Sequence, residues 1–230
     1  MKLLSLSTAE QGGSVAVFNS GRLACESYWD SKITHSQRLT PMVEQVLDQS
    51  GIGMHQIDGF IAAKGPGSFT GLRIGIAFIL GLAQTTGKPA AGVSSLDAIA
   101  WQWVSTGMPV CAMMDARRNE VYSSVYRFVE GTVIKTQETV SSPLDVISPL
   151  ENERVLYVGS GARAYKTYIL DQVGSNAEFP IAGSDHVSAS TMGQIALGDE
   201  NFFQTADNAL LPVYIRKSDA EYNLLKRQGY

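Results

Sequence analysis

The sequence has little of the residues that build disulfide frameworks and metal centres. Its 230 residues include two cysteines, Cys25 and Cys111, each alone in a segment with strand character. A disulfide framework or a thiolate metal site is therefore not indicated, and we expect both thiols to be small buried side chains. The three histidines, His35, His55 and His186, lie too far apart to form a His-x-x-x-His pair. No local zinc site, and hence no metalloprotease centre, is predicted.

Charge is also scarce. Lys and Arg total 18, Asp and Glu total 22, and the net charge is -4. A protein that binds nucleic acid by itself needs a basic patch to neutralise phosphates, and none stands out. We expect any contact with RNA to be shared with a partner, which would also cover some of the apolar surface that a low charge implies.

Long hydrophobic runs are missing. Polar residues interrupt the first seven positions too early for a signal peptide, and the longest apolar run, residues 72–83, carries Arg73. That run is shorter than the ~20 residues that cross a bilayer. We expect a cytoplasmic protein without a membrane segment, whose 44% hydrophobic side chains provide a sizeable core for one large or two small domains.

The first half of the chain alternates strand and helix signals. Apolar runs bounded by turn residues predict strands over residues 3–7, 14–18, 22–28, 57–63 and 90–93. Helical spacing predicts helices over residues 34–49 and 69–85, and a third that Ser94 caps. Thr34 and Gln37 suggest a capping box, and Pro41 either kinks the first helix or marks its start after Thr40. The order is β-β-β-α-β-α-β-α.

The second half repeats the order of strand and helix signals found in the first. Strand-like runs occur at residues 110–115, 121–128, 132–138 and 155–158, and a glycine turn then precedes a helix over residues 163–173. We predict a duplicated α/β protein with two βββαβαβα-type lobes, residues 1–107 and 108–230, and a ligand cleft between them. The last segment is expected to pack back toward the first lobe.

Residues 65–73, with the sequence GPGSFTGLR, leave two interpretations open. Glycines after a strand let backbone N–H groups approach an anion at a helix N-terminus, although neither a P-loop nor the dinucleotide fingerprint is present. Alternatively, the glycines make a tight turn and let a neighbouring element pack closely. An ATP or ADP site with Mg²⁺ would use the turn and the ends of the two equivalent strands. Its candidate residues are Thr8, Gly65, Gly67, Ser68, Asp115 and Arg117.

The two lobes differ in the ligands that they could offer to Mg²⁺ in such a site. Asp115 could hold Mg²⁺ from the second lobe, whereas the first lobe offers only Ser7 and Thr8. Asp115 is equally well explained as a turn residue paired with Arg117 or Arg118. No catalytic residue is predicted.

With these segments in view, the sequence resembles the bacterial TsaB family, also called YeaZ, over essentially its whole length. The matching segments are residues 4–9, 35–42, 65–75, 115–122 and 212–216. The resemblance implies an actin-like (ASKHA, ribonuclease H-like) fold. It also implies a role with TsaD and TsaE in transferring a threonylcarbamoyl group to N6 of adenosine 37, in tRNAs that read codons beginning with A. The resemblance further implies that TsaB is the non-catalytic subunit in that pathway and that it contacts tRNA only indirectly, through the complex.

The resemblance also indicates what this chain lacks. TsaD holds a metal partly through a His-x-x-x-His helix, and the corresponding positions here are Ser95 and Ile99. Neither is an imidazole ligand. Family members usually carry Asp at the position of Ser7, and this departure weakens the case for a Mg-nucleotide site.

The family's first two helices form the contact with TsaD, or with a second copy of TsaB when TsaD is absent. Apolar and small residues at helical spacing are the predicted contacts, although they would equally serve as internal core. They are His35, Leu39, Met42, Val43, Val46, Gly71, Gly75 and Ile79. On this interpretation, Val43→Glu or Gly75→Leu abolishes association with TsaD and leaves the fold intact. The alternative function is an independent ATP-dependent phosphotransferase or ATPase of the same fold.

Overall fold

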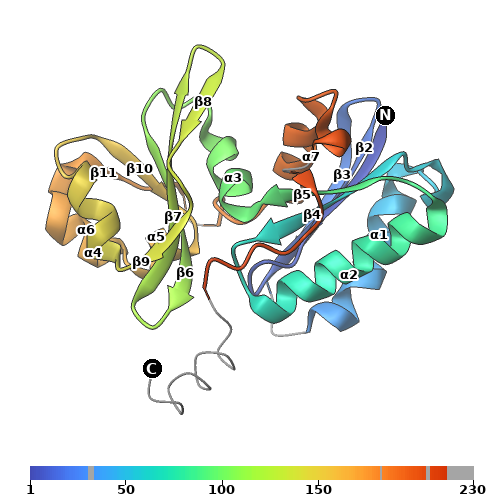
Figure 1. Cartoon of the computed structure of the whole chain (residues 1–230), viewed down its shortest axis with the longest axis horizontal. Coiled ribbons are helices and arrows are strands. Elements are labelled where there is room, and N and C mark those ends of the chain that lie inside the picture. The colour runs from blue at the N-terminus through green and yellow to red at the C-terminus, as the bar shows by residue number, and fades with distance from the viewer. Residues whose placement is uncertain (31–33, 182, 206–207, 217–230) are drawn as a thin grey trace.

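Two twisted sheets, one from each half of the chain, organise the molecule (Figure 1). The computed structural model describes residues 1–30, 34–181, 183–205 and 208–216. The first lobe, coloured blue to green in Figure 1, lies beside the second, coloured green to orange.

The two sheets share one topology. The first has the order β3-β2-β1-β4-β5 and the second the order β11-β10-β6-β7-β8, with β9 paired to β7. In each, an antiparallel three-stranded unit is extended by parallel strands. The strands of the first sheet are β1 (Lys2–Ser7), β2 (Gly13–Asn19), β3 (Arg22–Trp29), β4 (Gly59–Gly65) and β5 (Ala90–Ser94). Those of the second are β6 (Val110–Arg117), β7 (Glu120–Val129), β8 (Thr132–Lys135), β9 (Thr139–Ser141), β10 (Val155–Val158) and β11 (Ala177–Glu178). The predicted duplication is confirmed.

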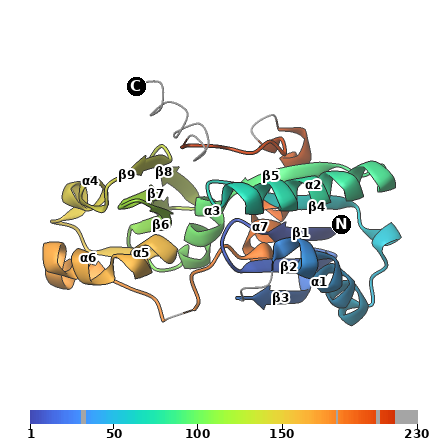
Figure 2. The same ribbon diagram turned by 90° about the horizontal axis from the view of Figure 1, so that it is seen from below.

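Helices cover both sheets. They are α1 (His35–Ser50), α2 (Phe69–Thr86), α3 (Ser95–Ala100), α4 (Pro143–Ile147), α5 (Ser160–Ala164), α6 (Lys166–Val173) and α7 (Ala189–Leu197). Short 3-10 turns occur at Met54–Gln56, Trp101–Trp103, Ser148–Leu150, Gly174–Asn176 and Phe202–Gln204. In Figures 1 and 2, α1 and α2 lie on the opposite side of the first sheet from α7.

The last helix of each half sits where the lobes join. α3, from the first half, contacts β6 and β7, whereas α7, from the second half, packs on β1 and β2. Ser5 and Ser14 fix α7 there, since Ser5 Oγ donates to Ala189 O at 2.7 Å and Ser14 Oγ accepts from Ala189 N at 2.8 Å. The two halves are therefore joined by reciprocal packing.

Local sequence signals explain most element boundaries. Helix α1 begins after Thr34 and ends at Gly51, which adopts the left-handed conformation (φ 66°). Pro41 lies inside α1, so the alternative in which it starts the helix is wrong. The capping box does not form, because the Thr34 hydroxyl donates to Gln37 Oε1 at 3.0 Å instead of accepting from the backbone.

Buried apolar side chains fill the space between sheets and helices in both lobes. Cys111 is fully buried in β6, as predicted, whereas Cys25 is half-buried and its Sγ contacts Gln49 Oε1 at 3.3 Å. Among the described residues, α2 is the one helix long and apolar enough to cross a membrane by length and composition alone. It packs on β4, and 33% of its apolar stretch is buried.

Candidate functional site

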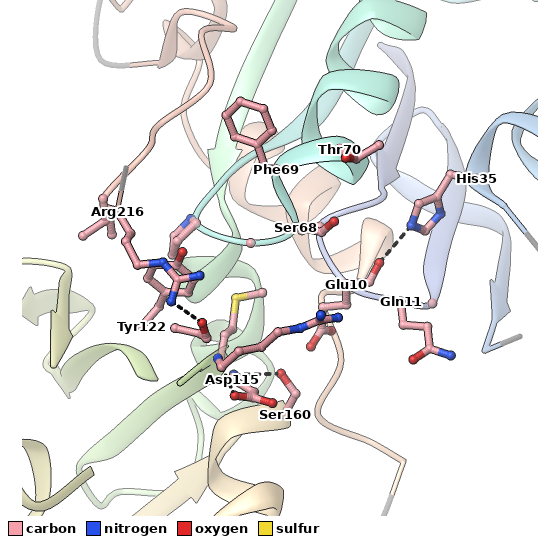
Figure 3. A pocket seen from close by; sticks show the side chains of 18 of the residues that line it. Glu10, Gln11, His35, Ser68, Phe69, Thr70, Asp115, Tyr122, Ser160 and Arg216 are labelled. Atoms are coloured by element: carbon pink, nitrogen blue, oxygen red, sulfur yellow. Dashed lines mark hydrogen bonds between the residues drawn. The ribbon is translucent and has the colours of Figure 1, made fainter. Parts of the chain in front are cut away.

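A cleft of about 970 Å³ lies between the lobes. Its walls come from the turn after β1, the segment before α1, the turn before α2, the end of β6, the start of α5 and the last described residues. Figure 3 shows Glu10 and His35 on one side and Tyr122 and Arg216 on the other. The cleft predicted from the duplicated pattern is therefore present.

The structure brings four of the six predicted nucleotide-binding residues to this cleft. Gly67, Ser68, Asp115 and Arg117 line it. Thr8 does not, because it is 2% exposed and its hydroxyl donates to Gly71 O at 2.7 Å.

Gly65 also lies outside the cleft lining. A Cβ placed on it would lie 2.6 Å from the carbonyl oxygen of Val213, so the chain's own last described segment covers this glycine. The turn formed by residues 65–73 is therefore only partly open to the cleft.

Gly67 in this turn and Gly71 in α2 pack against the residues that follow β1. A Cβ at Gly67 would lie 2.4 Å from Ala9 O, and one at Gly71 would lie 2.1 Å from Thr8 O. Two backbone N–H groups of the turn also have partners, since Ser68 N donates to Ala9 O at 2.7 Å and Gly71 N donates to Ser68 Oγ at 3.2 Å. These contacts favour the close-packing interpretation over a phosphate cradle.

Asp115 is exposed at the cleft and organises the turn that follows β6. Its Oδ1 accepts from Arg117 N at 2.7 Å, and its own N–H donates to Ser160 Oγ at 3.3 Å. Arg117, Arg118 and Asn119 all have positive φ, of 60°, 55° and 59°. Asp115 thus supports this turn through the backbone N–H of Arg117, which agrees with its interpretation as a turn residue.

Sequence reasoning missed the acids Glu10 and Asp185. Glu10 lines the cleft from the first lobe, and its Oε2 accepts from Val187 N at 3.1 Å. Asp185 is 1% exposed, forms an ion pair with Arg163 and accepts from Gly159 N at 2.7 Å. The first lobe therefore does place a carboxylate in the cleft, contrary to the expectation from Ser7 and Thr8.

No local pattern could have revealed these contacts. Glu10 and Val187 are separated by 177 positions, and their pairing depends on the path by which α7 returns to the first lobe. Tyr28 also lines the cleft, where burial, followed by the nearby Asp30 and Glu10 charges, raises its pKa.

The predicted partner-contact residues need correction. Seven of the eight are buried inside the chain, where they join the helices to the first sheet: Leu39, Met42, Val43, Val46, Gly71, Gly75 and Ile79. The eighth, His35, is half-buried in the cleft wall, and its Nε2 is 2.9 Å from Glu10 O. Helical spacing identified the core face of each helix, and the face open to a partner is the opposite one.

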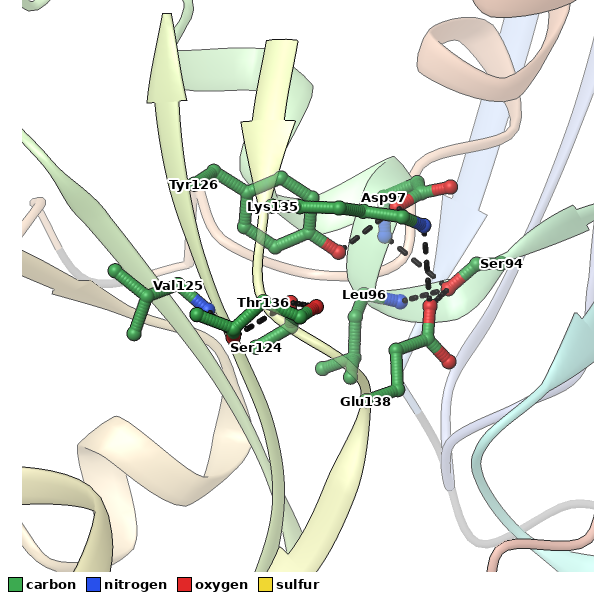
Figure 4. A network of polar contacts seen from close by, with 9 residues as sticks. All are labelled: Ser94, Leu96, Asp97, Ser124, Val125, Tyr126, Lys135, Thr136 and Glu138. Atoms are coloured by element: carbon green, nitrogen blue, oxygen red, sulfur yellow. Dashed lines mark hydrogen bonds and ion pairs between the residues drawn. The ribbon is translucent and has the colours of Figure 1, made fainter.

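Helix α3 carries Ser95 and Ile99, the two positions that the family resemblance aligns with the metal-binding histidines of TsaD. Ser95 and Ile99 are both fully buried, and the described residues contain no cluster of three or more His, Cys, Asp or Glu side chains suited to a metal ion. The half-buried Asp97 joins α3 to the second sheet (Figure 4). The Asp97 carboxylate accepts from Tyr126 OH and pairs with Lys135 Nζ, both at 2.8 Å.

Glu138 completes this network, because it accepts from Ser94 Oγ at 2.5 Å and pairs with Lys135 at 3.5 Å. Burial would lower the pKa of Lys135, but the Asp97 and Glu138 charges outweigh it and raise that pKa. These contacts join α3 and its cap to the second sheet, and so help to hold the lobes together.

Comparison with known proteins identifies the family. The family model described as TsaD, tRNA N6-adenosine threonylcarbamoyltransferase, matches residues 30–223. A Haemophilus influenzae protein named tRNA threonylcarbamoyladenosine biosynthesis protein TsaB is 30% identical, over 94% of this chain and 94% of its own length. The chain belongs to the TsaB family. A Bacillus subtilis TsaB is 27% identical over 99% of this chain and 100% of its own.

Solved structures agree with this membership. YeaZ from Pseudomonas aeruginosa superposes with a TM-score of 0.76 at 30% identity, covering 93% of this chain and 99% of that one. EutJ from Carboxydothermus hydrogenoformans, at 10% identity and a TM-score of 0.54 over 84% of this chain and 89% of its own, shares the fold alone. The fold of this TsaB-family chain is the predicted actin-like α/β fold.

Proposed function

We propose that this chain is the non-catalytic partner of TsaD in the synthesis of threonylcarbamoyladenosine in tRNA. The role in this biosynthesis follows from its TsaB-family membership. The finer assignment is that TsaD transfers the threonylcarbamoyl group to N6 of adenosine 37, that TsaE takes part, and that tRNA is bound through the complex in the cytoplasm. The observation that carries the non-catalytic role is the buried pair Ser95 and Ile99 on α3, which has no imidazole to offer a metal.

The exposed face of α2 is the surface we assign to TsaD. Leu80 is 45% exposed, and Ala77 and Gly81 are exposed beside it. Ile74 and Phe78, one turn apart, are half-buried along the flank of the helix and pack against the core. Small residues between apolar ones allow a partner helix to approach closely, which suits a helix–helix interface.

Helix α1 supplies a polar rim to this surface. It contacts α2, and its exposed side carries Glu44, Gln45 and Asp48. An apolar centre with a polar border is the usual composition of an interface between proteins that also fold separately. The same face would serve a second copy of the chain when TsaD is absent.

A matched pair of variants tests this assignment. Leu80→Asp places a charge at the centre of the proposed interface, and Leu170→Asp makes the same change at a helical leucine of α6 that is 40% exposed. We expect Leu80→Asp to weaken binding to TsaD in calorimetry at least about tenfold, because desolvating an unpaired charge costs more than ~1.4 kcal/mol. Leu170→Asp should bind like the unaltered chain. Equal affinities for the two variants would overturn the assignment.

A further inference from the structure

The family-matching segment at residues 212–216 has no role in the function proposed so far, yet it crosses between the lobes. After α7, the chain runs back along the first lobe and ends, in the described part, between the lobes (Figures 1 and 2). Residues 213–216 all line the cleft. They form a strap with one end on each lobe.

The first-lobe end of the strap is fixed to β4 and to the first turn of α2. Val213 N donates to Lys64 O at 2.7 Å. The Tyr214 ring lies 4.9 Å from that of Phe69, and its hydroxyl accepts from Arg73 Nε at 2.9 Å. The Arg73 guanidinium also lies 3.8 Å above the Phe69 ring, a cation–π distance.

The second-lobe end is fixed to the turn between β6 and β7. Arg216 Nη1 donates to Ala116 O at 2.5 Å and pairs with Glu120 Oε2 at 3.2 Å. Its side chain is 24% exposed, so water screens this ion pair only partly. Arg216 contacts the turn that includes Arg117, Arg118 and Asn119. Their positive φ angles are unfavourable for non-glycine residues, so the conformation of this turn depends on contacts with its surroundings.

We propose that residues 213–216 couple the first turn of α2 to the β6–β7 turn across the cleft. Two positions separate Tyr214 from Arg216, so the strap has little slack between its anchors. Release at either end therefore loosens both anchored segments and lets the cleft widen. Since α2 carries the surface assigned to TsaD, the part of this inference that concerns TsaD rests on the proposed function; the coupling itself does not.

Hydrogen exchange of the isolated full-length chain tests the coupling. Arg216→Ala removes the side-chain contacts of the second-lobe anchor, and Tyr214→Ala removes those of the first-lobe anchor with Phe69 and Arg73. We expect each variant to speed exchange about tenfold at its own anchor, as loss of ~1.4 kcal/mol of local stability implies, and also at the other anchor. The two sets of amides are those of residue 65 with residues 67–72, and those of residues 116–121. Arg154→Ala, which removes an exposed ion pair with Glu178 away from the strap, is the matched control and should change neither set.

The double variant separates coupling from two independent contacts. If the anchors are coupled, the amides of the double variant Tyr214→Ala/Arg216→Ala should exchange little faster than those of either single variant, because the loss of one anchor already frees the strap. Remote amides that are unchanged in both single variants, or effects that simply add, would overturn the proposal. Unchanged exchange at the slowest amides of β1 and β6 confirms that the fold is intact.

A TsaD-binding measurement then distinguishes the two proposals. If the strap transmits to the α2 surface, Arg216→Ala weakens TsaD binding although Arg216 lies outside that surface, and Arg154→Ala does not. If the unaltered chain fails to bind TsaD while exchange shows coupling, the proposed function is wrong and the strap stands. If binding is normal but exchange shows no coupling, the strap is wrong and the function stands.

Discussion

At Gly75 the backbone of α2 lies directly against the end of β1. A Cβ placed there would lie 2.3 Å from Thr8 Oγ1 and 3.1 Å from Leu6 Cδ1, both in the buried core. The glycine spacing of this segment is therefore explained by packing within the chain. Gly75→Leu, expected from the sequence to act on a partner, would act on the fold first.

The stability of two glycine variants checks this at the residue scale. Gly75→Leu overpacks the core and should lower the free energy of unfolding by roughly 1–3 kcal/mol in urea titrations. Gly81→Leu is the control, because nothing lies within 4 Å of a Cβ at Gly81. It should be neutral or stabilise by up to about 1 kcal/mol, since leucine favours a helix over glycine. Similar losses in both variants would contradict the packing account.

The buried thiol of Cys111 gives a pH dependence. Burial raises the pKa of Cys111 from its ordinary value of 9.0 to about 12. The unfolded chain loses this proton near pH 9, while the folded chain keeps it up to about pH 12. The stabilisation is therefore fully present below pH 9 and is lost as pH rises through this window, by about 1.4 kcal/mol per pH unit.

Cys111→Ala should flatten this alkaline loss. We expect unfolding curves from pH 8 to pH 11 to show a smaller decline in Cys111→Ala than in the unaltered chain, by the slope of one proton. Cys25→Ala changes a half-buried thiol and serves as the comparison. Parallel declines in Cys111→Ala and the unaltered chain would show that Cys111 ionises alike in both states.

Among the elements, those with strong local signals were predictable. The Gly51 end of α1 and the Gly87 end of α2 follow from capping rules, and the structure agrees. Helix α1 also begins after Thr34, although the Thr34 hydroxyl makes no cap hydrogen bond. The Ser94 cap of α3 is formed, with its hydroxyl accepting from Leu96 N at 3.2 Å. What α3 contacts was not predictable, because the partners of Asp97 lie 29 and 38 positions away on another sheet.

The network around Asp97 should stabilise the junction between α3 and the second sheet. Tyr126→Phe removes a buried hydroxyl that donates to Asp97, and we expect a loss of about 1 kcal/mol at pH 7. Tyr168→Phe, at an exposed position on α6, should cost nothing measurable. Urea unfolding of both variants provides the comparison. Equal stabilities would show that Lys135 alone satisfies Asp97.

The Tyr126 variant also has an expected pH signature. Burial, followed by the Asp97 charge and its hydrogen bond, raises the pKa of Tyr126 well above its ordinary value of 10.0. The folded chain thus keeps a proton that the unfolded chain releases above pH 10, and stability falls as pH rises beyond that point. Above pH 10, the free energy of unfolding should therefore fall less steeply with pH in Tyr126→Phe than in the unaltered chain, by the slope that corresponds to one proton.

At the scale of the whole molecule, the sequence was enough to predict two similar lobes and a cleft between them. The repeated order of strands, the 107-residue offset between Thr8 and Asp115, and the glycine turns were local features. The contacts of Glu10 and Asp185 were not predictable in the same way, because Glu10 accepts from Val187 N, 177 positions away, and Asp185 accepts from Gly159 N, 26 positions away.

The cleft also provides a test between the two functional hypotheses. An independent ATPase would require an anion site, yet Thr8 and Ala9 cover the glycine turn and the Glu10 carboxylate faces the same space. We expect titration of ATP with Mg²⁺ into the purified chain to show no micromolar binding in calorimetry. Micromolar binding that Asp115→Asn or Glu10→Gln abolishes would favour the enzyme hypothesis. Binding unchanged by both would place the nucleotide elsewhere.

The most direct test of the central claim is reconstitution of threonylcarbamoyl transfer to tRNA from purified components. With TsaD, TsaE and the threonylcarbamoyl donor present, adding this chain should produce modified adenosine, measured by mass spectrometry of digested tRNA. Omitting either TsaD or this chain should remove the product. Product formed by this chain without TsaD, or by TsaD and TsaE equally well without this chain, would contradict the account.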